Sequence, residues 1–524
     1  MTHITRRWLL APVLLLAAAV LFVVVERVRG TLGLRHWERE MRARGEKFST
    51  EELAPPLPND PAIKLVSAEE ARGLLTVATM PQSFPGTLTP AASGKARSLV
   101  SLDHWLDNDG KTNSWAELAP VLDSTLREIP ALRATLTNQA FFIRLNYQEG
   151  FNLLLPQLAG YKTAAQAMNC ATIRALHEGR FDEAFENLLA GTYATRLAEG
   201  DGILISQLVR IACAAITTAG LWEALQTDGF SDAQWAALQA RWQQQEFMQA
   251  FASCLQMERA LAATAYDGRQ YSLRQLASMN GMGGPFGTGQ EDSPRGEIAE
   301  MFRPLFDFLQ PARRLAVLAV WRMAWVQQDQ LYHHEQMQRL IDTLRRQATE
   351  RRVPTQPSKP DEDEFNVGSQ FLAEGATGFY DRSRHWLALQ IMPAFGNAGA
   401  KAERAEVLRE LALTAIALKR HQLRHHRLPP TLEALVPEFL PRPPHDWYSG
   451  QPLHYQPNAD GSFVLYSVGP NGSDDHGSGL DAKGDLRGLF AASALDIVWP
   501  QKATPEEVAA AERESKPGRR NAKR

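Results

Sequence analysis

Four aspartates lie close together near the C-terminal end of the sequence, in a stretch rich in glycine. They are Asp474, Asp475, Asp481 and Asp485, within GPNGSDDHGSGLDAKGD. Calcium takes about six to eight hard oxygen ligands in an adaptable geometry, and a glycine-rich loop can curl to supply them. Aspartate and glycine are also ordinary residues of solvated turns. The stretch therefore predicts either a structural calcium site or an acidic turn whose residues serve only the backbone.

Histidines recur at a spacing that could bind a second kind of metal. His421 and His425 are four residues apart on a predicted helix, so both could reach a zinc ion on one face. Arg420 and Arg424 surround them and would repel a cation. We interpret this segment, and the His333-His334-Glu335 run of another predicted helix, as polar helix surface and not as a metal site.

Motifs of enzyme active sites are absent from the sequence. It contains no P-loop, no GxGxxG following a predicted strand and no GxSxG, so neither nucleotide binding nor a serine nucleophile is indicated. Its cysteines, Cys170, Cys213 and Cys254, lie in apolar helical patterns without CxxC spacing, which is typical of buried structural thiols. We therefore assign no catalytic or cofactor-binding residue. An enzyme whose catalytic groups come from distant segments remains the alternative.

Composition limits the classes of protein that fit this chain. Its 524 residues exceed one ordinary hydrophobic core, so we expect two or three domains. Apolar residues make up 44% and charged residues 22%, as in globular proteins. With 56 basic and 59 acidic side chains, the net charge of −3 gives no electrostatic reason to expect nucleic-acid binding.

Residues 1–30 predict a membrane anchor. Trp8 to Val25 contains no charged residue, and about 17 to 25 apolar residues are needed to span a bilayer as a helix. Arg6 and Arg7 precede the run, and small residues lie within it at 17–19. This combination also fits a cleaved signal peptide. Because the apolar run continues to Val25, an uncleaved single span over residues 8–25 is favoured.

The residues after this span leave its orientation open. Arg27, Arg29 and Arg35 follow it, so counting positive charges does not favour an exported body, although the rule weakens before a long domain. Residues 31–61 form a spacer, with a charged helix predicted over Leu34–Leu53 and a proline-rich end.

Residues 62–400 predict a helical body. Apolar residues recur at helical spacing through most of the segment from residue 141 onward. Ala175–Gly200 predicts two antiparallel helices, with Gly179 in the turn and the small Ala184 where the helices pack. Glycine and proline content predicts flexible loops near 279–296 and 353–366.

Residues 401–500 predict a small α+β module, so the expected fold class is mainly α. An amphipathic helix over Arg404–Arg427 ends at a proline-rich turn. Two strands, Pro452–Gln456 and Phe463–Val468, flank a hairpin turn at 458–461. The last residues, 501–524, predict a disordered basic tail.

The order of these elements resembles the globular half of the major pseudopilins of type II secretion systems. In that family a helix and a proline-containing turn precede a D-P-W-G-x-P-Y-like segment and a short antiparallel sheet, followed by a Gly/Asp loop and a closing D-I-x-x-W segment. Asp446-Trp447-Tyr448 matches the first motif loosely, and Asp496-Ile497-Val498-Trp499 resembles the last. The resemblance implies a calcium ion at the Gly/Asp loop, and therefore at Asp474, Asp475, Asp481 and Asp485.

The sequence departs from that family at its N-terminal end. The short leader, the processing site and the early glutamate of the membrane helix are missing, so assembly into a pilus is not expected. Anchor, spacer, helical body and such a module together also resemble large uncharacterised families of bacterial membrane-anchored proteins, which implies no activity.

These patterns together predict a place in the cell and a class of function. The resemblance implies a bacterial inner-membrane protein with most of its chain in the periplasm. We expect a non-enzymatic binding or scaffold protein with a protein partner. A cell-envelope hydrolase and a secretion-system accessory protein are the alternatives.

Overall fold

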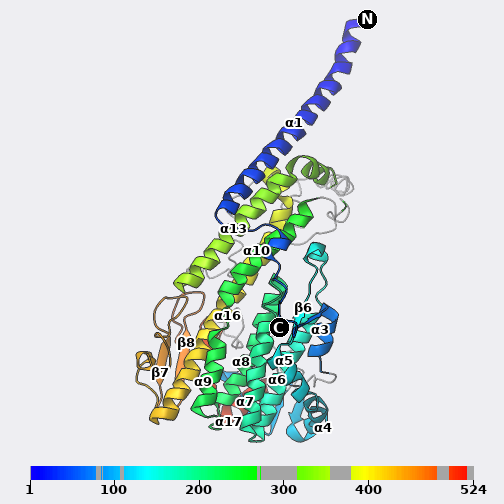
Figure 1. Ribbon diagram of the computed structural model, residues 1–524. Helices are drawn as coiled ribbons and strands as arrows, with labels where there is room; N and C mark the ends of the chain where they lie inside the picture. Colours follow the sequence, from blue (N-terminus) through cyan, green and yellow to red (C-terminus); the bar gives the residue numbers. More distant parts are fainter. Residues whose placement is uncertain are drawn as a thin grey trace.

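The computed structural model describes residues 2–77, 84, 87–106, 111–267, 272, 315–353, 379–480 and 495–515. Within these residues the chain is mainly helical, as predicted, and its strands form small sheets. Figure 1 shows helix α1 (Thr2–Ala43) projecting from one end of an elongated helical body. The loop predicted at 279–296 lies outside the described residues, as does nearly all of the loop predicted at 353–366.

Helix α1 runs without a break from the predicted anchor into the predicted spacer. It ends at Ala43 because Gly45 adopts a positive φ of 91°, a conformation that favours glycine and closes helix ends. Helix α2 (Thr50–Leu53) then starts at a capping box between Ser49 and Glu52. The single helix predicted over Leu34–Leu53 is therefore two helices, separated by a turn.

The second half of α1 packs closely against α13 (Val326–Glu350) and the π-helical turn before it, Trp321–Trp325. Glycine makes this approach possible, because a Cβ atom at Gly30 would lie 2.8 Å from Cγ and 3.1 Å from the backbone nitrogen of Gln328. The Gln328 amide donates to the carbonyl of Glu26 at 2.9 Å and to its carboxylate at 2.7 Å.

Between Val13 and Val25, helix α1 leaves most of its apolar side chains uncovered. Their exposed fractions include 61% at Val13, 71% at Leu15 and 63% at Leu21. Among the residues described, the helix with the length and hydropathy to cross a membrane is α8 (Leu204–Leu225), and 67% of its apolar window is buried in the protein. Side chains are described in α1 only from residue 12 onward, which is partway into the predicted span.

The predicted antiparallel helix pair is confirmed. Helix α6 (Gln157–His177) and helix α7 (Phe181–Leu197) are joined by a turn in which Gly179 has a φ of 73°. Ala184 is fully buried between the packed helices. Helix α8 packs against both helices, so these three form the centre of the body.

Short elements cover the outer side of α6. The elements before α6 are β1 (Lys64–Val66), α3 (Ala68–Leu75), β2 (Pro90–Ala92), β3 (Lys95–Ala96), a 3-10 turn (Leu99–Ser101), β4 (His104–Leu106), β5 (Thr112–Ser114), α4 (Trp115–Leu126), α5 (Ile129–Asn138), β6 (Phe141–Ile143) and a second 3-10 turn (Tyr147–Asn152). Strand β1 pairs in parallel with β6, and β4 pairs antiparallel with β5. In a third small sheet, β3 lies between β2 and the C-terminal strand β10 (Gln501–Lys502).

Helix α16 (Trp386–His425) is longer than predicted and is buried over much of its length. It packs against α8, α9 (Asp232–Gln243), α10 (Phe247–Tyr266) and α13, while α15 (Phe379–Arg384) precedes it. The boundary predicted between the body and the C-terminal module at residue 400 falls inside this helix. Its residues 402–418 are all buried, although five are charged: Glu403, Arg404, Glu406, Arg409 and Glu410.

Carboxylates from neighbouring helices cap the N-termini of three long helices. None of α8, α10 and α16 has a side-chain cap of its own, so the first backbone N–H groups need other acceptors. We call the carboxylates that supply them the interhelical caps. They are Asp329 of α13 on Leu387 (2.8 Å) and Ala388 (3.1 Å), Glu406 of α16 on Phe247 (2.8 Å) and Met248 (3.3 Å), and Glu258 of α10 on Leu204 (2.7 Å).

The predicted strands of the C-terminal module are confirmed. Strand β7 (His454–Pro457) pairs antiparallel with β8 (Phe463–Ser467) around the predicted turn. Strand β9 (Ile497–Trp499), from the second motif of the resemblance, adds to the other edge of β8. The short 3-10 helix Leu432–Leu435 follows α16.

The predicted disordered tail is wrong for residues 501–515. Strand β10 (Gln501–Lys502) pairs with β3, and helix α17 (Pro505–Ser515) packs beside β2. The side chain of Thr504 accepts a bond from the backbone of Glu507 and the Glu507 carboxylate accepts one in return, which starts this helix. The buried Val508 then fixes the helix to the body. Residues 516–524 lie outside the described residues.

Candidate functional site: a cavity between α8 and α16

The structure describes two of the four predicted calcium ligands. Asp474 and Asp475 follow β8, whereas Asp481 and Asp485 lie outside the described residues. The Asp474 carboxylate accepts bonds from the Tyr466 hydroxyl and from the backbone of His476, both at 2.9 Å. Asp475 accepts a bond from the Asn471 amide at 2.9 Å.

A buried aspartate organises the loop that carries these two residues. The Asp496 carboxylate accepts backbone bonds from Asp475 (3.3 Å), Gly477 (2.8 Å) and Ser478 (3.2 Å). Burial raises its pKa to about 6, although these bonds act in the opposite direction. Within the described part of the chain, no three His, Cys, Asp or Glu side chains meet as a metal-binding group. The calcium prediction therefore depends on the two aspartates that are not described.

The histidines noted in the sequence have other partners. His421 Nδ1 lies 2.9 Å from the Arg427 carbonyl, and His425 Nε2 lies 3.3 Å from the Glu438 carboxylate. His333 and His334 are fully buried in α13, so they are not the polar helix surface that the sequence predicted. Burial lowers the pKa of both imidazoles.

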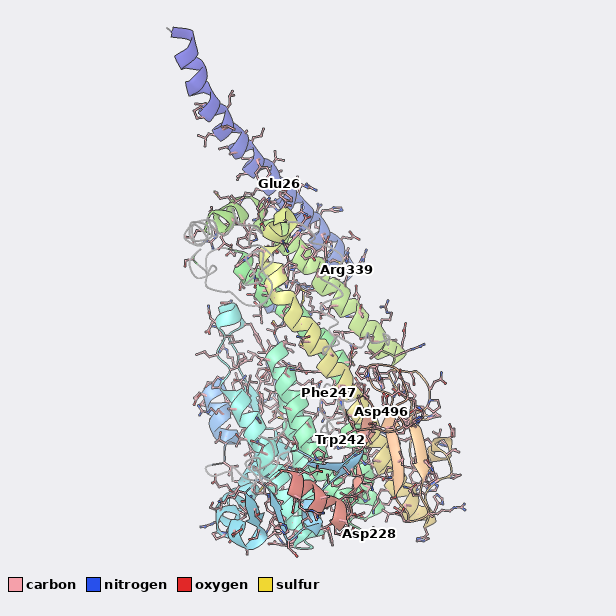
Figure 2. All side chains as sticks on the ribbon, turned by 180° about the vertical axis from the view of Figure 1, so that it is seen from behind. Glu26, Asp228, Trp242, Phe247, Arg339 and Asp496 are labelled. Carbon is pink, nitrogen blue, oxygen red and sulfur yellow. The ribbon has the colours of Figure 1, made fainter. Side chains whose placement is uncertain are left out.

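A cavity of about 920 Å³ lies between α8 and α16, where the helical body meets the C-terminal module. We call it the α8–α16 cavity. Helix α6 contributes Lys162 and Gln166 to its lining, while Tyr448 and Pro470 come from the module. Trp242 and Phe247, at the end of α9 and the start of α10, also line it (Figure 2). Cavities of roughly 300 to 1,000 Å³ are the usual size of small-molecule sites, and they often lie between domains.

Helix α8 provides the apolar side of the cavity. Leu208, Ile211, Ala212 and Ala215 line it, and their spacing of three and four residues puts them on one helix face. Two of the four are alanines, whose short side chains leave space that larger residues would fill. This face can hold an apolar group without any polar partner.

The opposite side, on α16, is polar. Lys401 is exposed, while Glu403 and Arg404 are buried. Burial raises the pKa of Glu403 to about 7, despite a hydrogen bond with Gln347. Burial also lowers the pKa of Arg404 to about 10, so its guanidinium stays protonated at neutral pH.

Arg409, farther along α16, also lines the cavity but has its own counter-ion. Its Nε donates to the Glu406 carboxylate at 2.6 Å, and its Nη2 contacts the same oxygen. The same carboxylate caps α10, so this pair belongs to the helix junction. Lys162, Lys401 and Arg404 are the other basic residues of the described lining.

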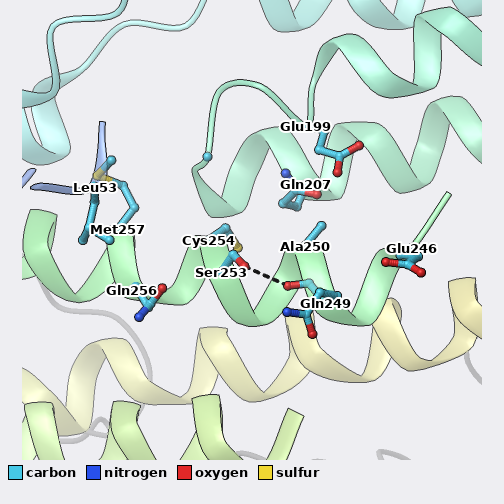
Figure 3. Close-up of a pocket in the computed structure, with 11 residues that line it drawn as sticks. Leu53, Glu199, Gln207, Glu246, Gln249, Ala250, Ser253, Cys254, Gln256 and Met257 are labelled. Atoms are coloured by element: carbon cyan, nitrogen blue, oxygen red, sulfur yellow. Dashed lines mark hydrogen bonds between the residues drawn. The ribbon is translucent and has the colours of Figure 1, made fainter. Parts of the chain in front are cut away.

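A second, smaller pocket of about 300 Å³ lies along α10 (Figure 3). Leu53, Glu199, Gln207 and Met257 line it together with Cys254. Burial raises the pKa of the Cys254 thiol well above its ordinary value, which keeps it protonated and unreactive. This pocket offers no activated nucleophile.

Sequence patterns did not identify the α8–α16 cavity. The sequence predicted an amphipathic helix over Arg404–Arg427 and a helical body, but no cavity between them. One signal was present: Lys401, Glu403 and Arg404 interrupt an alanine-rich stretch over residues 398–405. Such residues are rarely buried unless they have partners or a task. No family model, curated protein or solved structure matches the chain.

Proposed function

We propose that this protein is a membrane-anchored, non-enzymatic binding protein that holds an amphiphilic small molecule in the α8–α16 cavity. One observation carries the proposal: the cavity has an apolar side on α8 and a charged side on α16. A cavity of this size with one apolar and one charged side suits a ligand that has an apolar part and a polar part.

The membrane anchor in this proposal is supported by α1. Its apolar side chains from Val13 to Val25 are largely exposed on a helix that leaves the body (Figure 1). Exposed apolar surface of this extent is expected to be covered, and a bilayer would cover it without a protein partner.

A periplasmic body and a calcium-stabilised, pseudopilin-like module belong to the same proposal. The three-stranded antiparallel sheet that follows α16 supports the module, because the resemblance implies that order. Calcium should raise the melting temperature of the full chain relative to chelator, and Asp481→Ala with Asp485→Ala should remove the rise. A melting temperature that does not respond to calcium would remove the ion from the proposal.

Of the two alternative functions, the secretion accessory loses support and the enzyme keeps one supporting observation. A secretion accessory would need a free docking face on the helix of the module, whereas residues 402–418 of α16 are all buried. An enzyme is favoured only by Glu403, whose pKa of about 7 suits proton transfer. Among the residues that the structure describes, no histidine, serine or cysteine lines the cavity beside it.

Photolabelling of the full chain in lipid nanodiscs tests the proposal. An alkyl alcohol that carries a diazirine should label two regions: the lipid-facing part of α1 and the cavity-lining residues of α8 and α16. Replacing Ala215 with Trp should remove cavity labelling by filling the space, while labelling of α1 persists. Ala212→Phe is a milder second variant, and Ala510→Trp, on the exposed side of α17, is the control.

Mapping the labelled peptides by mass spectrometry decides between the outcomes. Labelling of α1 alone in the unmodified protein would show that the cavity takes no apolar ligand, and the binding function would be rejected. Absence of α1 labelling would reject the anchor.

A further inference from the structure

The lining contributed by α16 mixes polar and apolar side chains along the helix. Asn397, Lys401, Arg404 and Leu408 line the cavity, and their spacing of three and four residues puts them on one face. Ala400, Glu403, Ala405 and Arg409 of the same helix line it as well. The charged groups of α16 face a largely apolar α8, so the cavity is amphipathic across its width.

Positive charge dominates among the charged residues of the described lining. Lys162 of α6 and Lys401 of α16 are exposed, and neither forms an ion pair with another described residue. The buried Arg404 lines the cavity with them. The described part of the lining includes one acid, Glu403, and burial disfavours its charged form. Basic groups on two helices attract an anion and repel a cation.

We propose that the α8–α16 cavity selects an amphiphile with an anionic head group. The head group lies at Lys162, Lys401 and Arg404, and the hydrocarbon chain lies along the apolar face of α8. This inference rests on the proposed binding function and names the class of ligand. Carboxylate and phosphate head groups share the required chemistry, since both accept charge-assisted bonds from ammonium and guanidinium groups.

Four photoreactive probes test the inference. They share one diazirine-bearing alkyl chain and end in a carboxylate, a phosphate, a hydroxyl or an amine. The full chain is labelled in neutral-lipid nanodiscs at pH 8, and cavity labelling is divided by α1 labelling to correct for partition into lipid. We expect at least one anionic probe to label the cavity about tenfold more than the alcohol, because an anionic head group accepts charge-assisted hydrogen bonds from the basic side chains. The amine should label it least.

The double variant Lys162→Gln, Lys401→Gln tests the residues. Both side chains are exposed, so the protein should fold, and the preference for the anion should fall severalfold while alcohol labelling stays unchanged. Lys64→Gln changes an exposed lysine that is not among the lining residues, and it should leave the preference intact. An unchanged preference in the double variant would overturn the assignment of these lysines.

The outcomes separate this inference from the function on which it rests. Stronger labelling by the phosphate probe would identify a phospholipid-like ligand, and stronger labelling by the carboxylate a fatty-acid-like ligand; both support the inference. Equal cavity labelling by the alcohol and both anions would overturn it and leave the binding function intact. If no probe labels the cavity, the binding function itself fails.

Discussion

Buried carboxylates are the residues on which the helix junctions depend. Asp329 accepts bonds from two backbone N–H groups of α16 and from the indole of Trp321 at 2.7 Å. Burial raises its pKa to about 7, so the protonated form is favoured in the folded protein more than in the unfolded chain. The contribution of Asp329 to stability is therefore complete below its unfolded pKa, near 4, and is lost as the pH rises through about 7.

Replacing Asp329 with Asn should remove this part of the pH dependence. The neutral amide cannot ionise, so the difference in melting temperature between pH 5 and pH 8 should be smaller in the variant than in the unmodified protein. Loss of at least one N–H acceptor should also lower stability at pH 5, by about 1 to 3 kcal/mol. Thermal unfolding followed by circular dichroism at both pH values measures both effects.

Asp342→Asn is the matched control for this prediction. Asp342 lies on the same helix, with a side chain that is 59% exposed and 3.6 Å from Arg345. Its replacement should leave the pH dependence as it was. If Asp329→Asn retains the full pH dependence, other buried acids, such as Glu223 with its pKa of about 7, must produce it.

Elements with local signals could be predicted from the sequence, and elements with long-range partners could not. The α6–α7 turn needs only Gly179 and the apolar spacing around it, and the β7–β8 hairpin needs only its turn residues. The burial of α16 depends on four other helices, which no local pattern reveals. Helix α17 was missed because the basic residues beyond 515 dominate the composition of the tail.

Two glycines in helices make a matched test of element packing. A Cβ atom at Gly30 would contact the backbone of Gln328, while at Gly73 of α3 nothing lies within 4 Å. Gly30→Ala should separate α1 from α13 and lower stability by about 1 to 3 kcal/mol. Gly73→Ala should raise stability by about 0.5 to 1 kcal/mol, because alanine is the better helix former.

Chemical denaturation of both variants measures these opposite shifts. Limited proteolysis should also cut between α1 and the body faster in Gly30→Ala than in the unmodified protein. Equal stability of the two variants would mean that the contact of α1 with α13 adds little to the fold.

The topology of the whole molecule can be tested with a single introduced thiol. Cys170, Cys213 and Cys254 are buried, and burial raises the pKa of the first two to about 12, so they should not react in the folded protein. Leu154 is 78% exposed, and Leu154→Cys should react with a membrane-impermeant maleimide in intact bacterial spheroplasts. The unmodified chain is the control. Reaction only after lysis would place the body in the cytoplasm.

The candidate site depends on the packing of the whole molecule, which is why the sequence did not predict it. Residues from Thr87 to Pro470 line the α8–α16 cavity, so its existence depends on how the body and the module meet. The predicted site was a single loop of nearby aspartates, the kind of feature that sequence can reveal. Asp446 and Asp496 were noted as motif residues, and the structure shows that both accept backbone bonds in the module.

The interhelical caps form a series, in which α13 caps α16, α16 caps α10 and α10 caps α8. Glu223 of α8 extends it by accepting the N–H groups of Leu99 (2.8 Å) and Val100 (3.4 Å). If one of these helices detaches alone, the first amides of the helix that it caps lose their acceptor. The carboxylate that capped the detached helix is left without its donors. Partial opening is therefore penalised at each step, and these helices should unfold together as one cooperative unit. In native-state hydrogen exchange, the first amides of α16, α10 and α8 should exchange only through global unfolding, although helix ends normally fray early.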